Sequence, residues 1–407
     1  MYYCCILFFS FCIGLVVPLS VVVPRATAAS CRSDELETLS LQLAKKTLGS
    51  SRYLRLWRRW SDLGMDHIRD DLTNNLPHPI DPVAKSELDF NLGHGADLGI
   101  MPSFEDPGAR SGYSVNLFCR VSLLADLLVD TGGTLPPFFA KGVGDLLYNH
   151  NNDTNDKNDD TKMSTTCRLV SIGGACGYDF VSAALVASFH SSMNNSDTSS
   201  RSSPVIVQAT VFDYEEGWED LVNTMSVSTA TALTYYDHNH SCIFGGKCDI
   251  TKPLSDPVNA RTREVLDSTD LWTCQYCIAE NAVQLRESNF SFFVGLFSAA
   301  REGAMFVFTE TTHRLWPELM DVALATIHTE QGKGMSFEVG FPAIGGRNKT
   351  GRQMVLRKRE GAVISNEKLT LCEEFRRDSQ MHEQRLKNGI VRQKKRVPPV
   401  GNKFRNG

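Results

Sequence analysis

No excess of charge of either sign marks this chain of 407 residues. Lys and Arg together number 42 and Asp and Glu together number 47, so the net charge of −5 identifies no class of partner. The apolar fraction of 42% is that of an ordinary globular protein. The length favours about two or three structural units rather than one.

The sequence also lacks the paired motifs of a structural zinc site. One CxxC motif occurs, at Cys274 and Cys277, but no second CxxC and no His pair accompanies it. Because the motif lies inside an apolar run typical of a buried strand, we expect no metal. Outside the N-terminal leader there are nine cysteines, an odd number without regular spacing, so the redox compartment stays open.

Basic residues are absent from the N-terminus, where residues 4–23 form an uncharged apolar run of 20 residues. This run is long enough to span a bilayer, and Ala26 and Ala28 flank an A-x-A cleavage site. A signal peptide or signal anchor over residues 1–30 would associate the protein with a membrane, the secretory path or an organelle. A misassigned gene start would leave it cytosolic or nuclear.

Apolar residues at helical spacing predict a helical N-terminal region over residues 31–148. Within it we expect one helical stretch from 34 to about 72, a loop over 93–108 and a second helix over 113–130. The Asn- and Asp-rich residues 149–166 predict a disordered linker.

Strand-like and helix-like runs alternate over residues 167–360. Such alternation predicts an α/β fold with a doubly wound, mostly parallel sheet. The last two strand-like runs, 335–341 and 354–358, have no helix between them. Because this connection is too short for a crossover helix, the closing pair must be antiparallel.

A glycine-rich turn follows the first of these strands. Gly173, Gly174 and Gly177 lie between the apolar run 168–172 and a helix-like run at 180–189. A strand, a glycine turn and a helix present backbone N–H groups to a nucleotide-like ligand, although an ordinary strand-to-helix turn has the same pattern. Asp179 stands where the helix should begin, so we expect it to be the N-cap. The GxGxxG spacing of a Rossmann oxidoreductase is absent.

The antiparallel seventh strand resembles the sheet of the class I S-adenosylmethionine-dependent methyltransferases over about half of the chain. The SIGGACG run at 171–177 looks like the first motif of that superfamily. Within the superfamily, three short runs are similar to eukaryotic proteins grouped with fungal large-subunit rRNA uridine-N3 methyltransferases. These runs are SIGG, VFDY at 211–214 with Trp218, and CDIT at 248–251.

This resemblance implies S-adenosylmethionine as the cofactor. It implies that Asp213, ending the second strand, binds the ribose hydroxyls, and that Asp249 contacts the adenine amino group. The cofactor-binding residues that it implies are Ser171, Gly173, Gly174, Ala175, Gly177, Asp213, Tyr214, Cys248, Asp249 and Ile250. Two of these depart from the family pattern, since Ser171 replaces an acid and Ala175 replaces a glycine. We expect weakened rather than abolished binding.

Methyl transfer from a sulfonium depends mostly on positioning. An imide or amide nitrogen as the acceptor must also lose a proton, so a base helps. Glu280 at the end of the fourth strand is the candidate catalytic base, with Asp270 second. An acid that merely stabilises the first turn of the next helix is the alternative for Glu280.

The methyl acceptor is open at this point. We expect one polar helix over 369–385, followed by a basic tail in which residues 385–405 carry eight Lys or Arg and no acid. That tail would either bind RNA electrostatically or stay a solvated chain. The alternative function is a catalytically weak methyltransferase-fold scaffold at a membrane or in the secretory path.

Overall fold

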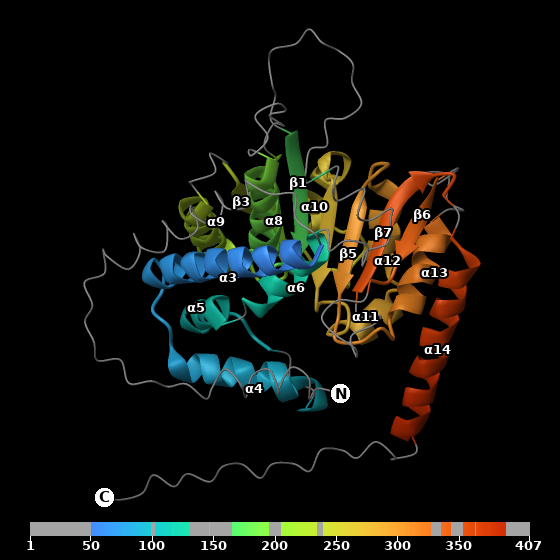
Figure 1. Cartoon of the computed structure of the whole chain (residues 1–407). Coiled ribbons are helices and arrows are strands. Elements are labelled where there is room, and N and C mark those ends of the chain that lie inside the picture. Colours follow the sequence, from blue (N-terminus) through green and yellow to red (C-terminus); the bar gives the residue numbers. More distant parts are fainter. Residues whose placement is uncertain are drawn as a thin grey trace, which may run out of the picture.

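A seven-stranded sheet lies at the centre of the part of the chain that the structure describes (Figure 1). This computed structural model describes residues 50–98, 102–116, 118–129, 146, 165–194, 205–233, 239–326, 335–342, 353–362 and 364–387. The strands are β1 (Thr165–Ile172), β2 (Val205–Asp213), β3 (Ser241–Lys247), β4 (Leu271–Gln275), β5 (Met305–Thr309), β6 (Met335–Gly340) and β7 (Gln353–Glu360).

The strand order is β3-β2-β1-β4-β5-β7-β6. The first five strands pair in parallel, whereas β7 is antiparallel to both of its neighbours, β5 and β6. The predicted doubly wound sheet with an antiparallel closing pair is therefore confirmed. Because all five strands β1–β5 run in one direction, their carboxyl ends meet at one edge of the sheet, and turns there are brought together.

Each face of the sheet has its own apolar core. Leu169 of β1 packs in one core with α8 (Tyr178–Asn194) and α9 (Glu219–Leu233), while its neighbour Val170 packs in the other. The second core is covered by α12 (Ser291–Ala299) and α13 (Trp316–Thr326). Every residue of β4 and of β5 is buried, which is why these strands read as short continuous apolar runs.

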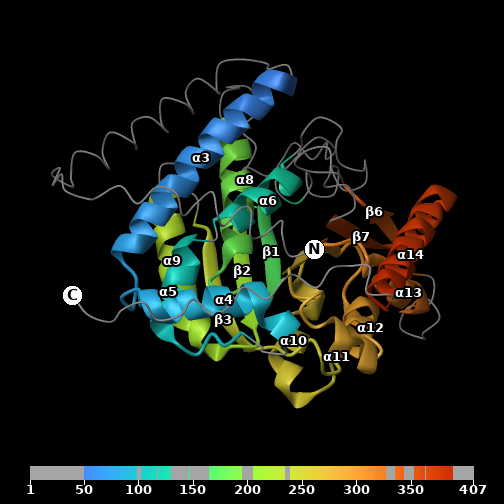
Figure 2. The ribbon, with the colours of Figure 1, turned by 90° about the horizontal axis from the view of Figure 1, so that it is seen from below.

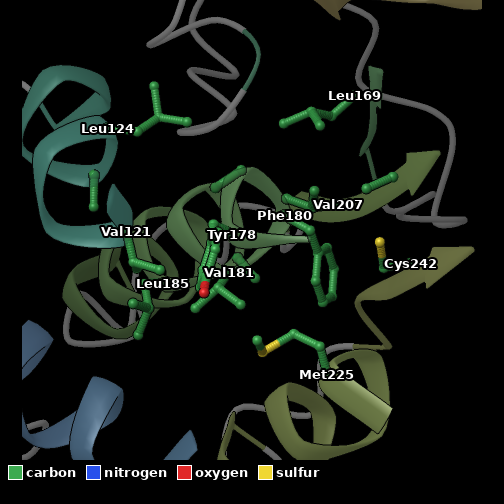
Figure 3. Close-up of a cluster of buried hydrophobic side chains, with 14 of the residues drawn as sticks. Val121, Leu124, Leu169, Tyr178, Phe180, Val181, Leu185, Val207, Met225 and Cys242 are labelled. Carbon is green, nitrogen blue, oxygen red and sulfur yellow. The ribbon is translucent and has the colours of Figure 1, made fainter. Parts of the chain in front are cut away.

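The N-terminal helices share the first of these cores. They are α3 (Ser50–Asn74), α4 (Pro82–Leu98), α5 (Pro107–Asn116) and α6 (Cys119–Leu128). Figure 3 shows Val121 and Leu124 of α6 on the same side of α8 as Leu185. The Trp57 ring of α3 lies 5.2 Å from the Phe189 ring of α8, and Figures 1 and 2 both show α3 crossing α8.

Two helix predictions in this region are wrong in detail. The expected single helix over 113–130 is two helices, α5 and α6, with Phe118 between them. The expected loop over 93–108 overlaps the end of α4 and the start of α5. Helix α4 begins at Pro82, where a missing N–H costs nothing, and the Asp81 carboxylate accepts hydrogen bonds from the next two free N–H groups, those of Val83 and Ala84.

The short helix α10 (Ala260–Glu264) precedes β4, the short helix α11 (Ala282–Glu287) follows it, and α14 (Asn366–Lys387) is the C-terminal helix. Helix α14 confirms the expected polar helix and packs beside α13 (Figure 2). Its Phe375 ring lies 4.6 Å from the ring of His313, which precedes α13. The leader at 1–30, the linker up to residue 164 and the basic tail beyond residue 387 lie outside the described residues. No helix among the described residues is both long and apolar enough to cross a membrane.

Candidate functional site

The turn after β1 has a backbone that favours glycine. Gly173 and Gly177 have φ values of 65° and 97°, and Ala175 between them has a φ of 49°. A Cβ at Gly173 would lie 2.1 Å from the Cys277 Sγ atom, so the chain leaving β4 passes directly against the turn. The turn therefore needs small residues, and it is held between β1 and the exit of β4.

Asp213 faces this turn from the end of β2. Its Oδ2 atom accepts a hydrogen bond from the Ala175 N–H at 3.0 Å, and its Oδ1 atom accepts one from the Glu215 N–H at 3.1 Å. Burial raises the pKa of this carboxyl to about 6, and the backbone N–H groups act in the opposite direction. Each carboxylate oxygen can accept a further hydrogen bond, so Asp213 is able to bind two neighbouring hydroxyls.

Asp249 follows β3 at the same edge and is half-buried. Its Oδ1 atom accepts hydrogen bonds from the Thr251 N–H and hydroxyl, at 2.9 and 2.6 Å. The Asn259 side chain fixes its backbone by accepting from the Asp249 N–H and donating to the Asp249 carbonyl. The neighbouring Cys248 and Ile250 side chains are 3% and 7% exposed and belong to the second core, so only Asp249 presents a polar group here.

Tyr214 lies on the surface beside Asp213. Its side chain is 64% exposed, and the Lys247 ammonium lies 4.7 Å from the centre of its ring. The ring is therefore available at the rim of the site and is not part of the core.

Asp179 is not an N-cap, so that prediction is wrong. It is the second residue of α8, and its buried carboxylate points into the sheet. It accepts hydrogen bonds from the Ser171 hydroxyl at 2.6 Å, from the Thr273 hydroxyl at 2.5 Å and from the Gln275 amide. Position 171 of β1, where the sequence resemblance implied an acid, holds Ser171, and a carboxylate from α8 lies against it. Thr273 and Gln275, polar residues in an otherwise apolar strand, were the signal for this network.

Glu310 is a second buried carboxyl group that the sequence did not reveal. It follows β5, is 2% exposed, and its Oε1 atom accepts hydrogen bonds from the Ile278 and Ala279 N–H groups at 2.7 and 3.1 Å. Its Oε2 atom has no hydrogen-bond partner in the described structure. Burial raises the pKa of Glu310 to about 8. Glu310 therefore fixes the turn that leads from β4 to Glu280.

Glu280 and Asp270 lie at opposite ends of β4. Glu280 is exposed at the carboxyl edge. Desolvation of its carboxyl by neighbouring atoms raises its pKa, and the positive charge of Arg120 opposes that rise only in part. Asp270 precedes β4 and forms an ion pair with Arg301 and a hydrogen bond with the Arg168 N–H. Only Glu280 of the two candidate bases is therefore placed near the glycine turn.

Unpaired buried oxygens line the sheet beside this turn. Gln275, Thr309 and Gln353 are neighbours in register across β4, β5 and β7. One side-chain oxygen of each is buried and has no hydrogen-bond partner in the described structure. They lie on the α8 side of the sheet, because Val307, two residues before Thr309, packs in the first core. Each of these side chains is at most 3% exposed, so the three oxygens lie inside the sheet and not on a surface that another molecule contacts.

No protein-family model matches the sequence, and no curated protein matches it. Among solved structures, the antibiotic-resistance methyltransferase Kmr is 11% identical with a TM-score of 0.28, over 48% of this chain and 87% of that chain. The 16S rRNA (adenine(1408)-N(1))-methyltransferase from Catenulisporales acidiphilia is 14% identical with a TM-score of 0.25, over 49% and 87%. Haemonchus contortus phosphoethanolamine N-methyltransferase 1, in complex with phosphoethanolamine and S-adenosylhomocysteine, is 12% identical with a TM-score of 0.34, over 76% and 56%.

At these identities the likeness concerns the fold alone. The order of the seven strands and the reversed direction of β7 are those of the Rossmann-like fold of class I methyltransferases, as the sequence resemblance implied. The similarity to rRNA uridine-N3 methyltransferases stays a prediction.

Proposed function

We propose that this chain is an S-adenosylmethionine-dependent methyltransferase. The contact between Asp213 and Ala175 carries the proposal, because it joins the carboxylate that ends β2 to the glycine turn after β1 at 3.0 Å. In an open α/β sheet, ligands bind outside the carboxyl ends of the strands, next to such a turn. The close approach of Gly173 to Cys277 leaves no room for a side chain at position 173, so the backbone of the turn is exposed to the exit of β4.

In this proposal the strand order sets how the cofactor lies. Asp249 after β3 accepts from the adenine amino group, Asp213 after β2 accepts from the ribose hydroxyls, and the rest of the cofactor extends across β1 towards β4. S-adenosylmethionine supplies a methyl group on a positively charged sulfur. The buried network of Asp179 with Ser171 and Thr273 keeps the ends of β1 and β4 in fixed register, so that the methyl donor is positioned.

The proposed acceptor is a nitrogen of an RNA base. The support is the resemblance of the three sequence motifs and the basic segment 385–405. The sequence suggested Glu280, at the carboxyl edge beside the turn, as the base.

Calorimetric titration of the full-length protein tests the cofactor. We expect S-adenosylmethionine to bind and NAD not to bind. Asp213→Ala should weaken S-adenosylmethionine by roughly 1.5–3 kcal/mol, the scale of hydrogen bonds to a charged group. The control is Asp267→Ala, an exposed acid away from the site, which should bind as the wild type does. Undiminished affinity in Asp213→Ala would remove Asp213 from the site.

The tail tests the acceptor. Replacing Lys394, Lys395 and Arg396 by Ala should weaken binding to all RNAs about equally. It should also make the slope of log affinity against log salt concentration shallower by roughly two to three units, because each lost phosphate contact releases one counterion fewer. S-adenosylmethionine affinity should not change. An unchanged RNA affinity and salt slope would argue against an RNA acceptor.

A further inference from the structure

Arg120 belongs to α6, which precedes the alternating strands and helices, and its side chain places a cation at the carboxyl edge of the sheet. Its guanidinium carbon lies 4.9 Å from the centre of the Tyr276 ring and 5.5 Å from that of the Tyr113 ring. Tyr276 is the residue directly after β4, and its φ of 63° is rare for a residue with a side chain. The two rings fix the position of the cation at the exit of β4.

The guanidinium makes no direct contact with a carboxylate among the residues that the structure describes. It forms no ion pair and donates no hydrogen bond there, although its side chain is half-buried. Aromatic rings attract the charge of a guanidinium but accept none of its five N–H groups in a normal hydrogen bond. A partly desolvated cation with no carboxylate in direct contact is costly, so this position fits an anionic ligand group.

Arg120 lies at the β4 side of the glycine turn. Its charge lowers the pKa of Cys176, a thiol within the turn, against the stronger effect of burial. It acts in the same direction on the carboxyl of Glu280. One cation and one exposed carboxylate are thus close to each other and to the turn, although they do not form an ion pair.

We infer that Arg120 and Glu280 bind the amino-acid end of the cofactor. Arg120 donates to the α-carboxylate, and Glu280 accepts from the α-ammonium group. This inference rests on the proposed function, which orients the cofactor with adenine at β3 and ribose at β2 and therefore brings its other end to β4. Opposite charges a short distance apart match the two charges of an amino acid. Glu280 is then a binding residue, in place of the base that its position after β4 suggested.

A pair of ligands isolates this contact. S-adenosylhomocysteine carries the amino-acid end, and 5′-methylthioadenosine has the same adenosine and an uncharged sulfur but lacks that end. We expect Arg120→Gln to weaken S-adenosylhomocysteine by about 10- to 100-fold in calorimetric titration of the full-length protein. Its affinity for 5′-methylthioadenosine should match that of the wild type. The control is Arg359→Gln, an exposed arginine at the far end of β7, which should change neither affinity.

Two further variants separate binding from structure and from catalysis. Arg120→Lys keeps a cation between the rings but loses the fork of N–H groups, so it should fold as the wild type does and lose about 3- to 10-fold for S-adenosylhomocysteine alone. Glu280→Gln should likewise weaken S-adenosylhomocysteine alone. A Glu280→Gln enzyme with a lower kcat and unchanged affinity would overturn the binding role of Glu280.

The possible failures are distinguishable. Equal losses for both ligands in the Arg120 variants would make Arg120 a structural residue and overturn the inference. A wild-type protein that binds both ligands with the same affinity would also overturn it, while leaving the proposed cofactor in place. A wild-type protein that binds neither ligand would contradict the proposed function, and this inference with it.

Discussion

Replacing Glu310 by Gln tests the electrostatics of the turn that carries Glu280. Burial raises the pKa of Glu310 from 4.5 to about 8, so the folded chain binds this proton more tightly than the unfolded chain does. Below pH 4.5 both states are protonated and the group has no effect on stability. Between pH 4.5 and about 8 only the unfolded chain releases the proton, so the free energy of unfolding falls as the pH rises.

The size of this effect follows from the pKa. At about 1.4 kcal/mol per pKa unit, the loss approaches roughly 4–5 kcal/mol once the pH exceeds the folded pKa. Glu310→Gln cannot titrate, and its amide oxygen can still accept from the Ile278 and Ala279 N–H groups. Relative to the wild type, the variant should therefore gain stability steadily from pH 4.5 to 8.

Urea denaturation of both proteins at half-unit steps from pH 4.5 to 8.5 measures this difference. The matched control is Glu367→Gln at the start of α14, where the carboxyl is 83% exposed, and its curve should follow that of the wild type. The pKa of Asp213, also raised by burial, contributes a similar slope below pH 6 in all three proteins and so cancels. Parallel curves for the wild type and Glu310→Gln would refute the buried, protonated Glu310.

Two predictions concern the glycine turn and its support. Asp179→Ala should destabilise the fold by roughly 3–5 kcal/mol, because the Ser171 and Thr273 hydroxyls and the Gln275 amide lose their acceptor inside the sheet. Thermal unfolding measures this loss of stability, and a loss below about 1 kcal/mol would contradict the network. Ala175→Gly should stabilise the fold by about 1 kcal/mol, because it relieves the positive φ and keeps the N–H that Asp213 binds; a lower melting temperature would contradict this.

The strands of the sheet could be read from the sequence because their apolar runs are local signals. The runs that became β4 and β5 are buried on both faces and are bounded by polar residues, and the short gap between β6 and β7 permitted only an antiparallel pair. No separate helix was expected over residues 82–92, because proline usually interrupts helical structure; here Pro82 instead occupies the first turn of α4, where proline is favoured.

The residues that support the site could not be predicted in the same way. Asp179 was expected to interact within its own helix, yet its partner Thr273 is 94 residues away in the sequence. Glu310 binds the backbone 31 and 32 residues before it. Nothing in the sequence around Arg120 distinguishes it from any other charged residue of a helix, and only its contact with the Tyr276 ring places it at the edge of the sheet. Such contacts depend on tertiary structure and leave no local pattern.

A crystal structure of the full-length chain with S-adenosylhomocysteine tests the central claim most directly. The account predicts the ligand across the carboxyl ends of β3, β2, β1 and β4, with its ribose hydroxyls within hydrogen-bond distance of Asp213 and its amino-acid end beside Arg120. Crystals grown at saturating ligand that hold it elsewhere, or that hold none, would contradict the account.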